Sequence, residues 1–413
     1  MIQSDNHPRL WLWCLFPAIT MSLGWGLRGY IRGGPLGAMI PGAMIGLALC
    51  LLLSRERESA LVAAFAAVGV GFGGQETYGQ TVHIATLPES WAWGITGFTL
   101  KGAAWGLLGG AAIGIALTRE RYRPAQLISA FSFMVAATWA GWKLIDQPKL
   151  IYFSNRLDKP REEIWFGLLL GGIVLLAWLS LIAGARLPWR FALWGALGGG
   201  IGFGLGAAIH VWGRVHAPDF PFEWWKTMEF TFGALLGLSY GYCAWRHRND
   251  LAPPLPVEST PPALIPSLAL AAVAIAIGVA AEDLLPVRFD YTIIGAVLLS
   301  LAVFSRAFSW QTAITVTYCA FALDFVKNRA DFPAPVLWAF LILTTAATAI
   351  YTARTARMRT LFLFLVASAV AVALGKGLLV PPKGIGLHLM VTEMTFVALA
   401  IAAVLLAPRQ SHS

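Results

Sequence analysis

Long apolar runs, separated by short polar or basic segments, recur along the whole chain. A helix needs about 20 apolar residues to cross the hydrocarbon core of a bilayer, and this length marks fourteen candidate spans. They are 10–27, 34–53, 59–78, 91–117, 125–145, 164–186, 189–212, 227–245, 264–281, 290–305, 311–326, 334–353, 360–379 and 387–407. We therefore predict an all-α, polytopic (multi-pass) integral membrane protein with transmembrane helices in two bundles of eight and six.

Composition strengthens the membrane assignment. Of the 413 residues, 58% are hydrophobic and 12% are charged, whereas soluble domains carry about 25% charged residues. The net charge of +9 comes from short basic clusters between apolar runs, which indicates membrane topology and not a nucleic-acid-binding face. The four cysteines stand singly inside apolar runs, without metal-ligand spacing. The lipid bilayer is the expected partner, and we expect no nucleic acid, metal or cofactor.

Basic residues in the loops predict the orientation. The clusters at 55–57, 119–123, 246–248 and 354–359 fall on one side if the N-terminus is cytoplasmic. Because short basic loops stay in the cytoplasm, we expect both termini there, in the cell inner (plasma) membrane.

A proline-rich stretch divides the chain. Six prolines fall within residues 251–266, and they favour an extended linker over a helix. We place an N-terminal bundle at 1–250, a cytoplasmic linker at 251–262 and a C-terminal bundle at 263–413.

The glycine-rich helices of the N-terminal bundle contain an internal repeat. Residues 25–49 align without a gap to residues 93–117, with ten identical positions that include Trp25/Trp93, and an Arg-Glu-Arg cluster follows each copy. The repeat thus covers about 25–57 and 93–121. Such repeats are typical of one class of transporters, although small residues at four-residue spacing also allow close helix packing alone.

Ionisable and amide side chains interrupt the apolar runs of the N-terminal bundle, mostly near their non-cytoplasmic ends. A charge within a bilayer is costly, so each such residue needs a partner or a function. The candidate substrate-binding residues are Arg28, Arg32, Gln75, Glu76, Tyr78, Gln80, Trp93, Lys101, Trp142, Lys143, His210 and Glu229. The long polar segment 142–165 is a candidate lid over them.

Three interpretations of this set stay open. Tryptophans and Lys143 suit an interfacial belt at head-group depth. Lys101 suits a structural ion pair with Glu76 or Glu229. The set as a whole suits a cavity open to the outer face, where arginines hold an anion while amides and aromatic rings hold a sugar-like solute.

The third interpretation predicts a secondary transporter of a small polar solute, sugar-like (a carbohydrate) or anionic. Arg28, Arg32 and Lys101 would bind the anionic part, and Glu76 or Glu229 would couple transport to protons. The alternative is a membrane enzyme acting at the periplasmic face on a lipid-linked or free saccharide. One of the two glutamates would then be the general base. A scaffold without any cavity is a third class.

Overall fold

Every element in the described part of the chain is a helix. The computed structural model describes residues 9–31, 33–76, 78–153, 163–184, 186–220, 223–252, 263–283, 290–328, 332–379 and 387–408. The α-helices are α1 (Leu10–Tyr30), α2 (Gly34–Leu53), α3 (Ser59–Gly73), α4 (Gly79–Thr86), α5 (Trp91–Leu117), α6 (Pro124–Gly141), α7 (Trp165–Ala183), α8 (Leu187–His216), α9 (Trp224–His247), α10 (Leu264–Asp283), α11 (Asp290–Ala302), α12 (Arg306–Trp310), α13 (Thr317–Asn328), α14 (Ala334–Thr355), α15 (Met358–Leu379) and α16 (Leu387–Leu406). Short 3₁₀ turns are η1 (Pro88–Ser90), η2 (Arg119–Arg121) and η4 (Arg248–Asp250), and π-helical turns are η3 (Trp142–Asp146) and η5 (Gln311–Val316).

The helices fit a multi-pass membrane protein. Each of the fourteen predicted segments contains a helix, although 59–78 is helical only as far as Gly73, and eight helices of the described chain are long and apolar enough to cross a membrane. These eight are Leu10–Tyr30, Gly34–Leu53, Pro88–Leu117, Pro124–Asp146, Trp165–Ala183, Leu187–His216, Ala334–Thr355 and Met358–Gly375. Fourteen spans and their division into eight and six are not confirmed and stay predictions.

Helices α2 and α3 form the centre of the molecule. Nearly all their side chains are buried, and the surrounding helices include α1, α5, α11, α13 and α15. Gly42 and Gly46 of α2 lie against the α3 backbone at Ala66 and Ala63. Because these glycines have no side chain, the two helix backbones come into direct contact, as small residues allow for helices within lipid. Helices that follow the proline-rich segment therefore pack directly on the first three helices. The boundary near 251–262 stays a prediction, and 253–262 lies outside the described residues.

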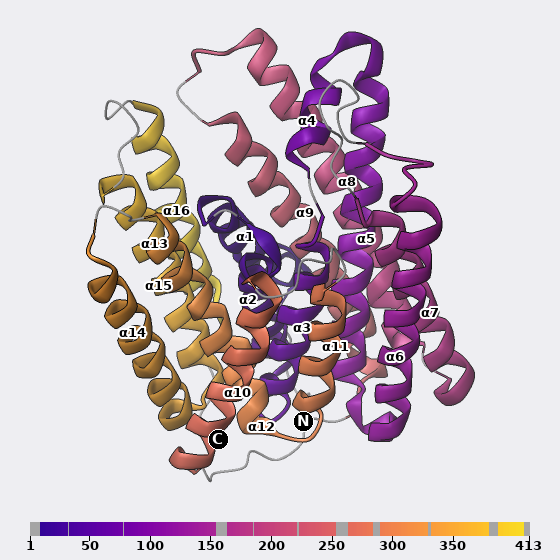
Figure 1. Cartoon of the computed structure of the whole chain (residues 1–413), viewed down its shortest axis with the longest axis vertical. Coiled ribbons are helices and arrows are strands. Elements are labelled where there is room, and N and C mark those ends of the chain that lie inside the picture. The colour runs from indigo at the N-terminus through magenta and orange to yellow at the C-terminus, as the bar shows by residue number, and fades with distance from the viewer. Residues whose placement is uncertain are drawn as a thin grey trace, which may run out of the picture.

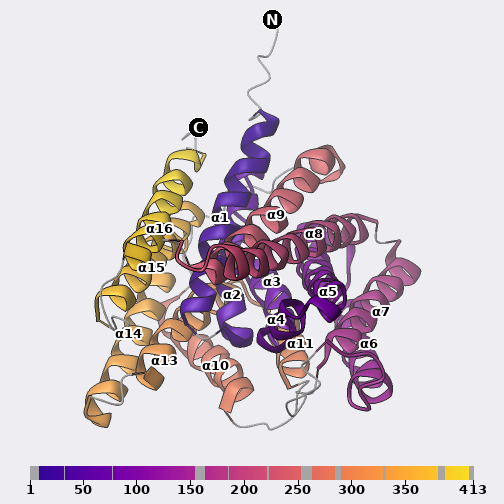
Figure 2. The ribbon, with the colours of Figure 1, turned by 90° about the horizontal axis from the view of Figure 1, so that it is seen from above.

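A second close pair is formed by α5 and α8. Gly106 approaches the backbone of Gly195, and Gly102 approaches that of Gly199. A Cβ atom at any of these glycines would overlap the opposite backbone. Figures 1 and 2 show α6 and α7 beside this pair, on the side away from α13–α16. The glycine-rich pattern of the sequence thus serves interhelical contact here.

The two aligned copies of the repeat form different structures. Residues 93–117 lie in the single helix α5, whereas 25–49 are divided between α1 and α2. The break follows Tyr30, and Gly33 and Gly34 have positive φ of 75° and 67° there. Pro35 stands where the second copy has Ala103, so it cannot donate the hydrogen bond that would continue a helix.

Candidate functional site

The described residues 75, 76 and 78–81, which we call the segment 75–81, join α3 to the first residues of α4, and α4 lies in the upper part of Figure 1, as does the α8–α9 connection. Two glycines position it. Gly73 packs against the Trp105 ring, and Gly74 packs against the backbone of Gly34 and Pro35. Side chains larger than hydrogen do not fit at either position, so the glycines let the chain turn directly against the start of α2 and the Trp105 ring of α5. The short helix α4, which the sequence did not predict, follows this turn.

Three buried polar side chains surround the ammonium of Lys101, and we refer to them with Lys101 as the Lys101 cluster. Lys101 Nζ lies 2.6 Å from Glu163 Oε1 and 3.7 Å from Glu76 Oε2, and it donates to Thr81 Oγ1 at 3.1 Å. The second carboxylate oxygen of Glu163, Oε2, accepts a hydrogen bond from the Phe153 amide at 2.9 Å. Lys101 is fully buried in α5, as its apolar sequence context suggests.

The two carboxylates of this cluster are not equivalent. Glu163 has a short ion pair and a backbone hydrogen bond. Neither carboxylate oxygen of the buried Glu76 has a partner within normal hydrogen-bond geometry among the described residues, although the backbone of Ile164 faces the carboxylate. With all groups ionised, one ammonium faces two carboxylates. Glu76 therefore carries the less compensated of the two charges.

A second set of polar groups, the Glu229 cluster, consists of Glu229, Lys226, Trp225 and Tyr78. Glu229 Oε2 lies 2.6 Å from Lys226 Nζ, and Glu229 Oε1 accepts hydrogen bonds from Trp225 Nε1 at 3.0 Å and Tyr78 Oη at 3.2 Å. Lys226 also donates to the Gly26 carbonyl at 3.0 Å. Glu229 is thus held from three directions by donors, which compensates for the burial of its carboxylate.

Arg28 joins the Glu229 cluster through Tyr78. It is buried, and its Nη1 donates to Tyr78 Oη at 3.0 Å. Its guanidinium also lies over the rings of Trp25, Tyr78 and Trp105, at 5.3, 5.4 and 4.9 Å from their centroids. Desolvated cation–π contacts of this kind contribute up to about 2 kcal/mol. Aromatic rings thus replace much of the hydration that the cation gives up.

The segment 75–81 connects the two clusters. Glu76 and Thr81 belong to the Lys101 cluster, while Tyr78 belongs to the Glu229 cluster. Arg28, Lys101 and Lys226 together balance Glu76, Glu163 and Glu229 in formal charge. The predicted pairing of Lys101 with Glu76 is present, whereas Glu229 pairs with Lys226.

Other predicted residues lie apart from the two clusters. Gln75 Nε2 donates to Thr292 Oγ1 on α11 at 3.1 Å, and Gln80 is half-buried on α4. Trp93 is largely exposed and donates to the Tyr152 carbonyl at 3.0 Å. Lys143 is exposed, over the buried ring of Trp142, as an interfacial residue would be. The last predicted residue of this kind, Arg32, lies outside the described residues.

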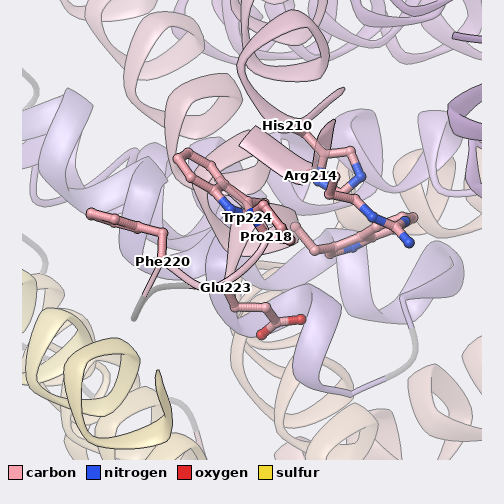
Figure 3. Close-up of a pocket in the computed structure, with 7 residues that line it drawn as sticks. His210, Arg214, Pro218, Phe220, Glu223 and Trp224 are labelled. Atoms are coloured by element: carbon pink, nitrogen blue, oxygen red, sulfur yellow. The ribbon is translucent and has the colours of Figure 1, made fainter. Parts of the chain in front are cut away.

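An open pocket lies where α8 ends and α9 begins, and we refer to it as the α8–α9 pocket. Its volume is about 510 Å³, and its lining residues are His210, Arg214, Pro218, Phe220, Glu223, Trp224 and Trp225. Figure 3 shows His210 and Arg214 together on one side, with the Glu223 carboxylate apart from them. Trp225 joins the pocket to the Glu229 cluster, because the same indole lines the pocket and donates to Glu229.

Several of these residues escaped the sequence analysis. Glu163 stands in the most polar loop of the chain and resembles a solvated charge. Lys226 follows two tryptophans and resembles a snorkelling belt residue. Arg214 and Glu223 lie near helix ends, where charges are ordinary. The i, i+3 spacing of Lys226 and Glu229 and the i, i+4 spacing of His210 and Arg214 were the available signals.

The fold and the buried charges define a class: an all-helical, multi-pass membrane protein with a polar site at one end of its helices. Among the described residues no group of three His, Cys, Asp or Glu side chains is placed to hold a metal ion. Comparisons with protein families, with curated proteins and with solved structures find no match to this chain.

Proposed function

We propose that the protein is a proton-coupled secondary transporter of a small polar solute, sugar-like or anionic. The observation that carries the proposal is Glu76, a buried carboxylate without a hydrogen bond, beside an ammonium that already pairs with Glu163. A carboxylate whose only ion pair is long and shared is costly in a low-dielectric interior, and a bound proton removes that cost. The coupling proton would therefore bind at Glu76.

The charge arrangement supports reversible protonation. A proton on Glu76 leaves the Lys101–Glu163 pair intact, so the cluster changes by one charge without loss of its short ion pair. Glu229, in contrast, is held by Lys226, Trp225 and Tyr78. We propose that Glu229 takes part in solute binding and that Glu76 binds the coupling proton.

The segment 75–81 offers a physical link between proton and solute. Tyr78 lies two residues after Glu76, and its hydroxyl joins Arg28 to Glu229. A shift of this segment on protonation changes the Glu229 cluster, and Trp225 of that cluster also lines the open pocket. Such a two-state element is what coupling requires.

The proposal predicts that Glu76→Gln abolishes proton-driven accumulation of solute. The amide keeps the size of the side chain and cannot exchange a proton. The measurement uses proteoliposomes with an imposed pH gradient and radiolabelled glucose, glucuronate and glucose 6-phosphate. Solute exchange without a gradient should persist, because the binding residues are unchanged.

Glu89→Gln is the matched control, because Glu89 is an exposed carboxylate at the same end of the molecule. It should transport as the unmodified protein does. Equal proton-driven uptake by Glu76→Gln and by the unmodified protein would rule out Glu76 as the coupling residue.

A membrane enzyme that acts on a lipid-linked or free saccharide is the second candidate. Two observations favour it: the α8–α9 pocket is open to the surface, and α5 and α8 are closely packed by glycine away from that pocket. A turnover assay in detergent solution distinguishes the enzyme from the transporter. An enzyme forms product there, whereas transport requires a closed membrane and does not occur. Product formation that disappears in His210→Gln would replace the transporter proposal.

A further inference from the structure

We propose that the α8–α9 pocket binds a saccharide that bears an anionic group, either a carboxylate or a phosphate. The inference rests on the proposed function, because it names the class of solute that the protein recognises. The pocket volume of about 510 Å³ lies within the range of about 300–1,000 Å³ typical of small-molecule sites. Aromatic walls with a few convergent polar groups are also typical of such sites.

The aromatic walls are held in place by their neighbours. Trp224 Nε1 donates to the Ala217 carbonyl at 2.9 Å, and its ring lies 5.3 Å from that of Phe220. Trp225 is fixed by its hydrogen bond to Glu229 and by stacking on Tyr78 at 5.6 Å. Flat rings held in this way present apolar faces against which the C–H face of a sugar ring packs, with little loss of side-chain entropy on binding.

One side of the pocket is cationic. Arg214 is exposed and has no ion pair with any described residue, and it lies one helical turn from His210. An arginine with free donors binds carboxylate or phosphate with two parallel hydrogen bonds. This geometry places the anionic group of the ligand beside α8.

His210 supplies an independent observation. Its side chain is 1% exposed, and neither ring nitrogen has a hydrogen-bond partner among the described residues, although the backbone of Trp224 faces the ring. A buried polar group without a partner costs about 1–3 kcal/mol. A ligand oxygen in the pocket would supply the missing hydrogen bond.

Glu223 determines the orientation in which a charged sugar binds in the pocket. Its carboxylate lies apart from His210 and Arg214 (Figure 3) and accepts hydrogen bonds from hydroxyls. It also repels an anionic group, so the ligand must orient its charge towards Arg214 and its hydroxyls towards Glu223. A polyol without a charge lacks the first contact, and a bare anion lacks the second and the ring stacking.

Equilibrium binding tests this inference without transport. The protein in phosphatidylcholine nanodiscs is titrated with glucuronate, glucose 6-phosphate, glucose and inorganic phosphate, and calorimetry reports the dissociation constants. We expect at least one of the two charged sugars to bind about tenfold or more tightly than glucose and phosphate, the effect of one charge-assisted hydrogen-bond pair. Equal affinities for glucose and the charged sugars would overturn the inference.

Variants of Arg214 and Trp224 test the contact to the anionic group and the contact to the sugar ring separately. Arg214→Gln should weaken the charged sugar about tenfold and leave glucose unchanged, while Arg121→Gln, an exposed arginine at the opposite end, should change neither. Trp224→Leu should weaken the charged sugar without an equal effect on phosphate. Thermal unfolding of each variant reports whether it is folded. A folded Arg214→Gln with unchanged affinity contradicts the inference.

A further experiment distinguishes a free charged sugar from a lipid head group as the ligand of the pocket. Nanodiscs that contain phosphatidylinositol present the same chemistry as a lipid head group, and competition with the free sugar shows which source the pocket prefers. Glu76→Gln should keep the preference for the charged sugar over glucose, because the residues that line the pocket are unchanged. Loss of uptake with binding intact therefore concerns the coupling residue, whereas absence of binding concerns the pocket alone.

Discussion

At the scale of single residues, buried charges in this protein are shared and not paired one to one. Lys101 serves two carboxylates, and the Tyr78 hydroxyl lies between Arg28 and Glu229. Removal of one side chain therefore leaves a different number of its buried partners without a hydrogen bond or ion pair, depending on which side chain is removed. This inequality predicts the order in which substitutions destabilise the protein.

Glu163→Gln should lower thermal stability more than Glu76→Gln does. Glu163 makes the 2.6 Å ion pair and accepts from the Phe153 amide, whereas Glu76 lies 3.7 Å from Lys101. Loss of one partner of a buried pair typically costs about 3–5 kcal/mol. Tryptophan fluorescence during heating in detergent measures both midpoints, and the reverse order would show that Glu76 is the principal partner of Lys101.

Tyr78→Phe removes the hydroxyl that joins Arg28 to Glu229 and keeps the ring stacked on Trp225. Because hydrogen bonds to charged groups contribute about 1.5–3 kcal/mol, a lower unfolding midpoint is expected. Tyr242→Phe is the control, since the Tyr242 hydroxyl makes no hydrogen bond to the described residues. Equal midpoints for both variants would mean that the Tyr78 link carries no stability.

The sequence identified part of this network for a physical reason. Glu76, Lys101 and Glu229 stand out because each interrupts an apolar run, where a charge is costly. Glu163 and Lys226 do not, since their sequence neighbours are polar or interfacial. Their partners are 62 and 200 residues away in the hydrogen bonds they make with Lys101 and Gly26, and such distances are set by the folded chain.

At the scale of helices, glycine determines which pairs approach closely. Gly106 of α5 meets the Gly195 backbone, while Gly375 of α15 has open space around it. Gly106→Ala should therefore cost about 1–3 kcal/mol through overpacking, and Gly375→Ala should be neutral or slightly stabilising. Unfolding midpoints of this matched pair give the comparison, and a tolerant Gly106 would show that α5 and α8 can separate without loss.

A helix terminus provides another test. Asp146, at the end of the π-helical turn after α6, accepts hydrogen bonds from the Phe166 and Gly167 amides at 3.3 and 2.9 Å. It therefore caps α7 from a distance. Asp146→Ala should lower the free energy of unfolding by about 0.5–2 kcal/mol and raise the rate of amide hydrogen exchange in the first turn of α7. An unchanged exchange rate there would show that Asp146 does not stabilise the start of α7.

Helix positions were more predictable than helix breaks. The apolar run 91–117 coincides with α5, because a sustained run of this length has few alternatives. The division between α1 and α2 depends on Gly33, Gly34 and Pro35 within an otherwise similar copy of the repeat. Helix α4 was not predicted, because its eight residues mix polar and apolar side chains and its burial depends on neighbours.

At the scale of the whole molecule, connections alternate between two ends. The α4–α5 and α8–α9 connections, which contain Glu89 and Asp219, lie at the upper end of Figure 1. Glu120 and Asn249 stand in the segments that follow α5 and α9, and these two segments meet where Arg121 donates to the Asp250 carbonyl. In a Cys14→Ser background, a cysteine at either upper position should react with impermeant maleimide added outside cells. A cysteine in place of Glu120 or Asn249 should react after permeabilisation, as cytoplasmic termini require. The opposite pattern would invert the predicted orientation.

The placement of Glu76 and Tyr78 on one seven-residue segment has a thermodynamic consequence under the proposed function. If a proton on Glu76 changes solute affinity by some factor, bound solute must change proton affinity by the same factor, because both routes join the same end states. Calorimetric titrations at several pH values, in buffers of different ionisation enthalpy, would give that factor and the number of protons taken up per solute bound. The coupling energy of a transporter would thus be obtained from equilibrium measurements, before any solute crosses the membrane.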